Sequence, residues 1–327
     1  MLARLQQATT LGLILAAAIW AAWLFRAGEP LWAIAGSAFM VFGYAIFLGA
    51  EFLLLRIVNR GDAVPPATVR QLLRAWWGEV WAAPLVFCWR QPFRSQAVPD
   101  WLPRRSAMSA PRGVVLVHGF VCNRGIWNPW MKRLRAGGVP YVAVNLEPVF
   151  GSLDSYPPCI ENAVRCIETA TGRAPVIVAH SMGGLAVRAW LSRCAGPRAH
   201  RVVTIGTPHR GTWLGRYALT RNGVEMRPGS TWLRRLTAQE RLRQGIDPCW
   251  AGRFTCFYSH GDNVVFPTST ATLPGADNRH VDGSAHVHLV FEPVVLDEVL
   301  RLIAEPDADL SKRLLDQSLA TTTPRRI

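Results

Sequence analysis

The chain has 327 residues, of which 50% are hydrophobic, and its formal net charge of +14 comes almost entirely from arginine. This length allows one large or two small domains with a substantial core, and the charge fits an anionic membrane surface or a nucleic acid. We expect no nucleic-acid partner, because the sequence has no zinc-finger spacing, RNA-binding signature or long basic run. The seven cysteines lack framework spacing, which favours free thiols in a reducing compartment.

Two apolar runs occupy the N-terminal part of the chain. Residues 9–25 carry no charge, and a second uncharged run covers residues 31–50. Each run is close to the ~20 residues that a helix needs to cross a membrane, and Gly28 and Pro30 between them are typical of a tight turn. We therefore predict that residues 1–60 form a hairpin of two transmembrane helices. A signal peptide in the first run is the alternative, and the second run argues against it.

Arginines flank the predicted hairpin on both sides. Arg4 precedes the first run, whereas Arg56, Arg60, Arg70 and Arg74 follow the second. The positive-inside rule places both of these flanks in the cytoplasm. The rest of the chain is therefore expected on the cytoplasmic side.

Residues 61–111 are expected to form an amphipathic connector. Apolar residues recur there at helical spacing with charged residues among them: Leu72, Leu73, Trp76, Trp77, Val80 and Trp81, with Arg70, Arg74 and Glu79. Tryptophan together with arginine suits a helix in the headgroup region of a membrane. The same tryptophans would also serve to pack the helix on a globular domain, and both interpretations stay open. Prolines 99, 103 and 111 mark a linker.

From residue 112 to residue 305 the pattern alternates between strands and helices. The predicted strands are 114–117, 141–146, 176–179, 201–205, 254–258 and 279–281, and helical patterns include 154–170 and 290–303. This alternation predicts an α/β domain with a mostly parallel sheet covered by helices on both faces. Residues 212–251 are too many for a simple connection and are rich in apolar side chains, which suggests a mobile cap. Residues 306–327 form a polar tail.

A pattern of strand, sharp turn and helix surrounds Ser181. Small or β-branched apolar residues precede it, and a helical pattern follows it. A serine at such a turn lies at the C-terminal edge of a parallel sheet, above the first amides of the next helix. The turn needs small residues two positions on either side, which Ala179 and Gly183 supply, although the usual motif has glycine at the first of them. We predict Ser181 as a nucleophile.

A serine nucleophile needs a base and an acid that orients the base. In this class of sheet the acid follows the serine along the chain, at the end of a strand. Asp262 directly follows the predicted strand 254–258 and is the candidate acid. Asp247, Asp277 and Asp282 compete with it, but none follows a long strand so directly.

The candidate base is His286. It lies in the loop before the closing helix, and the small residues just before it allow the ring to reach the serine. His288, two positions later, stays an alternative. His260 and His280 are expected to be structural.

Two backbone amides are expected to form an oxyanion hole. One belongs to Met182, directly after the nucleophile, and the other to Phe120, in the loop after the first predicted strand. His118 is expected to brace that loop.

Five motifs in order resemble those of bacterial α/β-hydrolase lipases and esterases, of the triacylglycerol-lipase-like group. They are Val115–Phe120, Ala179–Gly184, Gly206–Thr212, the Gly261–Asp262 turn and the Ala285–His286 loop. The resemblance covers roughly residues 112–305 and implies an α/β-hydrolase fold, here preceded by two transmembrane helices. It also implies a Ser181–Asp262–His286 triad and an acyl-enzyme intermediate, with no cofactor. Some relatives carry structural calcium or zinc, but no metal site is expected here, because no residues have convincing ligand spacing.

The expected function is that of a membrane-anchored lipase or carboxylesterase of the bacterial inner membrane. Its substrates would be lipophilic acyl esters, and membrane lipids its other expected partners. Two alternatives stay open: an acyltransferase that uses the same acyl-enzyme, and a catalytically silent membrane scaffold.

Overall fold

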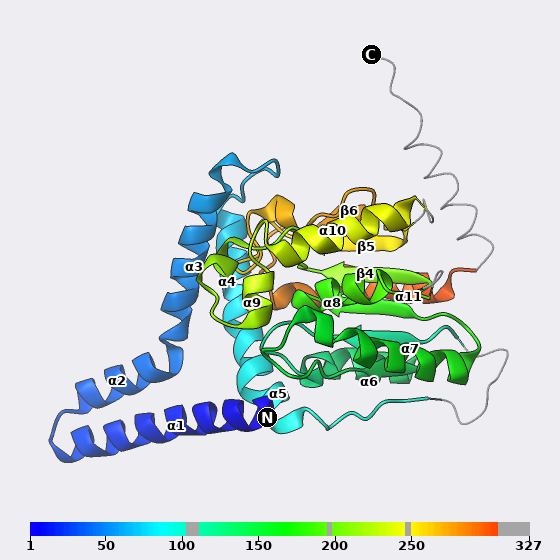
Figure 1. Ribbon diagram of the computed structural model, residues 1–327. Coiled ribbons are helices and arrows are strands. Elements are labelled where there is room, and N and C mark those ends of the chain that lie inside the picture. The colour runs from blue at the N-terminus through cyan, green and yellow to red at the C-terminus, as the bar shows by residue number, and fades with distance from the viewer. Residues whose placement is uncertain (103–110, 195–197, 246–249, 307–327) are drawn as a thin grey trace.

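The computed structural model describes residues 1–102, 111–194, 198–245 and 250–306. The linker proline at position 103, the competing Asp247 and nearly all of the predicted C-terminal tail lie outside these residues. A six-stranded parallel sheet with the order β2-β1-β3-β4-β5-β6 lies at the centre of the molecule (Figure 1). Its strands are β1 (Val114–Val117), β2 (Tyr141–Ala143), β3 (Val176–His180), β4 (Arg201–Ile205), β5 (Phe254–Tyr258) and β6 (Asp277–His280). The predicted α/β class with a parallel sheet is confirmed.

Both faces of the sheet are covered by helices, because the central strands are apolar on both sides. Every residue of β1, β3 and β4 is buried. Helices α6 (Asn128–Ala136) and α11 (Pro293–Ala304) pack on one face. Helices α7 (Pro157–Thr171) and α8 (Met182–Leu191) pack on the other. Such double coverage is what continuous apolar strands require.

The direction of strand addition reverses beside β3. The chain runs from β1 outward to β2, then returns to β3 on the other side of β1 and continues through β4, β5 and β6. Ligands of open α/β sheets bind in the crevice at such a switch point, outside the carboxyl ends of the strands. The loop after β1 and the turn after β3, which carries Ser181, both lie at this point.

The segment predicted as a cap is a helical insertion between β4 and β5. It contains η5 (Trp213–Tyr217), α9 (Arg221–Glu225) and α10 (Thr231–Gln244). The insertion is anchored to the core through Trp232, Leu233 and Leu236. Its Glu240 also forms a buried ion pair with Arg188 of α8, with 2.7 Å between Arg188 Nη2 and Glu240 Oε2. Mobility of the cap stays a prediction.

The N-terminal apolar runs differ from the predicted pair of spanning helices. Only α1 (Leu2–Arg26) is by itself long and apolar enough to cross a membrane among the described helices. The second run forms α2 (Pro30–Phe42) and α3 (Tyr44–Val58), which are bent by 49° at Gly43 and count as one span only if taken together. Glycine weakens a helix interior, and a break there has a local cause. Two transmembrane helices are therefore not confirmed.

Helices α1 and α2 pack together as a shorter hairpin, with Gly28 at positive φ in the predicted turn. Ser37 Oγ donates to the carbonyl of Ala17 at 3.1 Å, and Trp20 Nε1 donates to the carbonyl of Trp32 at the same distance. In Figure 1 this hairpin projects away from the sheet.

Helices α3 and α4 (Val69–Pro84) instead lie against the sheet's carboxyl edge, toward which the strand arrows of Figure 1 point. Phe52 and Leu55 of α3 are buried in a cluster with Phe266 and Ala285. The connector helix α4 begins at a Thr68 capping box and is followed by η2 (Leu85–Arg90) and α5 (Gln91–Arg94). The N-terminal helices therefore lie where the sheet topology places the site.

The tryptophans of α4 divide between the two interpretations that the sequence left open. The partly buried Trp76 donates its indole N–H to the carbonyl of Ala45 at 2.9 Å and packs inward. Trp77 and Trp81 are 57% and 59% exposed and face away from the domain. One face of α4 therefore packs on the hydrolase domain, and the other is free to meet a membrane.

Candidate active site

Ser181 lies on a strained turn between β3 and α8. Its φ of 54° and ψ of −128° are rare for a residue with a side chain. The turn is held by its neighbours: Ser181 N donates to the carbonyl of Ile205 at 2.8 Å, and Thr207 Oγ1 donates to the carbonyl of Ser181 at 2.9 Å. Gly183 is required because a Cβ there would lie 2.5 Å from the carbonyl oxygen of His118. Strain of this kind is found at functional sites that the surrounding structure holds in place.

The structure brings the predicted acid and base together. His286 Nδ1 lies 2.9 Å from Asp262 Oδ2 and 3.0 Å from Asp262 Oδ1. The Asp262 carboxylate also accepts hydrogen bonds from Val264 N and Val265 N at 2.9 and 2.8 Å, which fixes its orientation. With Nδ1–H directed at this carboxylate, Nε2 keeps its lone pair and can accept a proton.

The hydroxyl of Ser181 is not yet engaged by this base. Among the described residues, the polar contacts of His286 run to Asp262, Asn263 and His180, and none joins its ring to Ser181 Oγ. Catalytic hydrogen bonds are often long without substrate and shorten in the complex. The triad assignment therefore stays a prediction, with two of its three members in contact.

The pKa of His286 is raised above its ordinary value. Burial lowers this pKa, but the negative charges of Asp262, Glu79 and Glu51 outweigh burial and favour the imidazolium. The neighbouring His180 has its pKa lowered well below the ordinary value, first by burial and then by the charge of His286. These shifts favour placing the transferred proton on His286 and leaving His180 neutral.

The loop after β1 contains the second strained residue near the turn. Val121 has a φ of 52°, and it and Ser181 are the non-glycine residues with positive φ among the described residues. Positive φ is a genuine outlier for a β-branched residue. The sequence analysis missed Val121, because nothing in the local pattern signals this conformation.

His118 braces this loop, as expected. Its Nδ1 lies 2.9 Å from the carbonyl oxygen of Gly119, and its Nε2 accepts a hydrogen bond from Leu146 N at 3.0 Å. Burial lowers the pKa of His118 to about 4, so the ring is neutral. It therefore serves as a fixed hydrogen-bonding group.

The candidate oxyanion residues lie on either side of the nucleophile turn. Met182 is buried at the start of α8, with its amide in the first helical turn. The half-buried Phe120 packs edge to face against Phe150, with ring centroids 5.9 Å apart. Asn222 of the insertion donates to Met182 Sδ at 3.5 Å, so the insertion packs against the residue that follows the nucleophile. The role of the two amides stays a prediction.

Gly119 leaves no room for a side chain, and this leads to a prediction. A Cβ there would lie 2.8 Å from Ser181 Cβ, so Gly119→Ala must displace either the loop or the nucleophile. Since loss of one oxyanion donor costs about 10²- to 10³-fold in kcat, we expect a loss of that order in ester hydrolysis. Gly137→Ala is the control, because a Cβ there meets only ordinary contacts from 3.6 Å outward. Unchanged kcat in Gly119→Ala would contradict the assignment of this loop.

The competing residues have other partners. Asp277 pairs with Arg279 at 2.8 Å, and Asp282 lies 3.1 Å from His280 Nδ1. His288 approaches Ser284 Oγ at 3.3 Å and packs against Gly78. These contacts direct all three away from the Ser181 turn.

His260, His280 and Asp282 form a cluster whose ligand atoms lie within 4.8 Å of one another. His260 N donates to His280 Nε2 at 3.2 Å, which leaves the proton of that ring on Nδ1, directed at Asp282. A metal ion would have to displace this proton. The hydrogen bonds therefore account for the cluster as it stands.

Three further residues near the triad carried no role in the sequence analysis. Gly206 has a φ of 55°, and a Cβ there would lie 2.8 Å from Asp262 Oδ2. Asn263 Oδ1 accepts a hydrogen bond from His286 N at 3.2 Å. Glu79 accepts hydrogen bonds from Val287 N and His288 N. The glycine-rich motif around Gly206 was visible in the sequence, whereas the contacts of Asn263 and Glu79 join distant segments.

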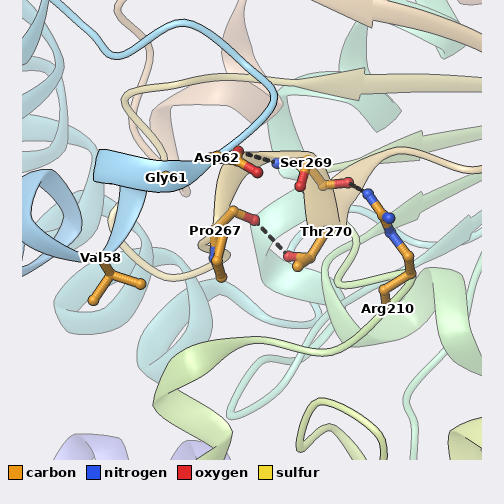
Figure 2. Close-up of a pocket in the computed structure, with 7 residues that line it drawn as sticks. All are labelled: Val58, Gly61, Asp62, Arg210, Pro267, Ser269 and Thr270. Carbon is orange, nitrogen blue, oxygen red and sulfur yellow. Dashed lines mark hydrogen bonds between the residues drawn. The ribbon is translucent and has the colours of Figure 1, made fainter.

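A separate pocket of about 340 Å³ lies where residues 58–62 meet the 267–270 loop (Figure 2). Its polar groups are already engaged with each other: Ser269 N donates to Asp62 Oδ2 at 2.7 Å, and Arg210 donates to the carbonyl of Ser269. The lining contains none of the candidate catalytic residues. The pocket is therefore a seam between the N-terminal segment and the hydrolase domain.

Comparisons with known proteins agree with this fold. Comparison with the curated proteins gave no match. Among solved structures, the mature lipase BlEst2 of Bacillus licheniformis is 17% identical, with a TM-score of 0.50 over 63% of this chain and 98% of that chain. Lipase B of Aspergillus fumigatus is 18% identical, with a TM-score of 0.49 over 69% of this chain and 67% of that chain. At such identities the likeness concerns the fold alone.

The sequence model of the Alpha/beta hydrolase family matches residues 114–323, which is more than half of the sequence. The match begins at β1 and includes the nucleophile turn, the acid loop and the histidine loop. The chain belongs to the alpha/beta hydrolase family.

Proposed function

We propose that the protein is a membrane-anchored serine hydrolase that cleaves lipophilic carboxylic esters. One observation carries the proposal: the strained Ser181 turn directly follows His180, and the His180 ring lies against His286 of the buried Asp262–His286 pair, with ring centroids 4.6 Å apart. A hydroxyl, a base and an acid in this arrangement are what acyl transfer through an acyl-enzyme requires.

The proposed reaction begins with attack of Ser181 Oγ on the ester carbonyl carbon. The hydroxyl proton passes to His286 Nε2, and Asp262 stabilises the imidazolium at Nδ1. The amides of Met182 and Phe120 donate to the oxyanion of the tetrahedral intermediate. The alkoxide leaves with the proton from His286, and water activated by the same ring then hydrolyses the acyl-enzyme and restores Ser181.

The preference for lipophilic esters is supported by exposed apolar side chains on the N-terminal helices. Most of the large exposed hydrophobic residues of the described chain belong to α1–α5. Along α4, η2 and α5 they recur every four residues and form an apolar stripe: Leu73, Trp77, Trp81, Leu85, Trp89 and Phe93. A contiguous stripe of exposed apolar side chains marks an interaction surface. The name of the similar Bacillus licheniformis protein, a lipase, agrees with such substrates.

The proposed location is the cytoplasmic side of the bacterial inner membrane. Helix α1 and the hairpin that it forms with α2 supply the embedded part, whereas α3 packs on the hydrolase domain. The stripe on α4 adds an interfacial surface. The arginines that follow α3 favour cytoplasmic placement of the hydrolase domain.

The proposal is tested by covalent labelling of the detergent-purified protein with a fluorophosphonate probe. We expect the wild type to be labelled and Ser181→Ala to remain unlabelled, because the probe reacts with an activated serine. Ser192→Ala serves as control, since this partly buried serine caps the C-terminus of α8 and donates to the carbonyl of Ala189 at 2.9 Å, at the other end of the helix from Ser181. A wild type that stays unlabelled both in detergent and in lipid would overturn the proposal.

A further inference from the structure

Helix α4 packs closely on both catalytic loops. A Cβ at Gly261, next to Asp262, would lie 2.9 Å from Ala75 Cβ. A Cβ at Gly78 would lie 2.4 Å from the ring of His288. Glycines on both sides of the contact therefore allow the connector helix to approach the acid loop and the histidine loop more closely than side chains would permit.

Glu79 points from this helix into the histidine loop. Glu79 is 2% exposed, and its carboxylate accepts hydrogen bonds from Val287 N at 3.1 Å and from His288 N at 3.0 Å. Within the described part of the chain, Glu79 has no Arg or Lys ion-pair partner. A buried carboxylate without a cation is costly, so its position calls for a specific role.

A second carboxylate reaches the same loop from α3. Asn263 Nδ2 donates to Glu51 Oε2 at 2.7 Å, and Asn263 Oδ1 accepts a hydrogen bond from His286 N at 3.2 Å. The three successive amides of residues 286–288 are thus held by Glu51, acting through Asn263, and by Glu79. Both acids come from the N-terminal helices.

We propose that Glu79 is a positioning residue for His286, and that Glu51 supports the same loop through Asn263. This inference rests on the proposed function for its catalytic meaning. The two carboxylates fix the backbone that carries the ring, and their charge favours the imidazolium that forms when Ser181 gives up its proton. The N-terminal helices are then part of the catalytic machinery as well as an anchor.

The charged and titratable groups around the histidine loop determine how pH changes the influence of Glu79 on His286. They are Glu79 and Arg74 on α4, Glu51 on α3, Asp262 on the acid loop, and His286, His288 and Glu292 on the histidine loop and after it. Burial raises the pKa of Glu79 to about 7, against the lowering effects of its two backbone hydrogen bonds and of His286. Glu79 is therefore anionic above pH 7 and neutral below it, where it resembles glutamine.

The test is the pH profile of Glu79→Gln in the full-length protein, with a soluble short-chain ester as substrate. We expect kcat to fall about 10- to 100-fold above pH 8, the effect of losing one hydrogen bond to a charged group, with KM within about twofold. The ratio of wild-type to variant kcat should approach 1 below pH 6, where Glu79 is protonated in the wild type. A purely structural role predicts a ratio that does not change with pH, and that result would overturn the proposal.

The matched control is Glu298→Gln. Glu298 of α11 is buried like Glu79, with 7% of its surface exposed. Unlike Glu79, it pairs with Arg301 and Arg279, at 2.7 and 2.9 Å, away from the catalytic loops. We expect the ratio of wild-type kcat to Glu298→Gln kcat to stay constant across the same pH range.

A measurement that does not depend on turnover separates this inference from the proposed function. In the protein with isotope-labelled histidine, the NMR titration of His286, assigned by its loss in His286→Ala, should move to lower pKa in Glu79→Gln. Glu51→Gln should shift it in the same direction by less, and it replaces the first variant if that one does not fold. An unchanged His286 pKa in both would overturn the inference, whereas a shift in a protein that fluorophosphonate does not label would overturn the proposed function alone.

Discussion

His286→Ala is expected to lower kcat for ester hydrolysis by about 10⁵- to 10⁶-fold, as loss of the triad histidine does in serine hydrolases. Without the ring, the proposed mechanism lacks the base that takes the proton from Ser181 and the donor that protonates the leaving alkoxide. The measurement is steady-state hydrolysis by purified wild type and variant at pH 8, an alkaline pH, because the raised pKa of His286 shifts the neutral, proton-accepting form of the ring toward higher pH.

His288→Ala is the matched control, because sequence spacing alone left both histidines as candidates. The ring of His288 lies against α4 and near Glu292, with 3.7 Å between Nδ1 and Oε1 of the glutamate. We expect its kcat to stay within about threefold of the wild type, in line with the small effects of substitutions away from special features. If His288→Ala abolished hydrolysis and His286→Ala did not, the assignment of the base would be wrong.

The fold was predictable because its signals are local. Strands β1, β3 and β4 are continuous apolar runs, and such runs between helical patterns indicate a buried parallel sheet before any contact is known. Ser181, Asp262 and His286 were predicted as candidates in the same way, since each directly follows a strand or precedes a helix in the order that this sheet imposes.

The break in the second apolar run was not predictable from hydropathy. Residues 31–50 contain no charge and read as one span, whereas the structure bends at Gly43 and turns α3 onto the hydrolase domain. Glu51, at the end of that run, becomes a partner of Asn263, which lies 212 residues away in the sequence. Contacts between such distant segments leave no trace in a local pattern.

Glu79 shows the same limit for the connector. In the sequence it stands among arginines and tryptophans, where a glutamate normally belongs to the solvated face of a helix. The structure buries it against Val287 and His288 and exposes Trp77 instead. Compared with an ordinary surface helix, α4 thus buries a polar side chain and exposes apolar ones. This places a carboxylate beside the histidine loop and an apolar stripe on the outside of the helix.

This arrangement links the exposed apolar stripe to the proposed chemistry through a single helix. Trp77 and Glu79 are two residues apart on α4 and point to opposite sides, one outward and one toward the His286 loop. Under the proposed function, a lipophilic ester that binds to the stripe would meet the site beside this helix, because α3 and α4 lie along the carboxyl edge of the sheet (Figure 1).

Asp262→Asn is expected to lower kcat by about 10⁴-fold while leaving the fold intact, because it reverses the tautomer of the base. Asn263 and Glu79 still hold the histidine loop, and the new amide oxygen still accepts from Val264 N and Val265 N at the positions of Oδ1. The amide NH₂ group then faces His286 Nδ1 and donates to it, which moves the ring proton to Nε2. A protonated Nε2 cannot accept the proton of Ser181.

The measurement is kcat together with the thermal unfolding midpoint. We expect the midpoint to change little, since the side chains of aspartate and asparagine have nearly the same shape. Asp277→Asn is the control: Asp277 was a competing candidate acid, and its 2.8 Å ion pair with Arg279 lies on the exposed strand β6. Its loss should leave kcat within about threefold, as is usual for surface substitutions. Nearly full activity in Asp262→Asn, with a large loss in Asp277→Asn, would show that the acid had been wrongly assigned and that Asp262 only shapes its own loop.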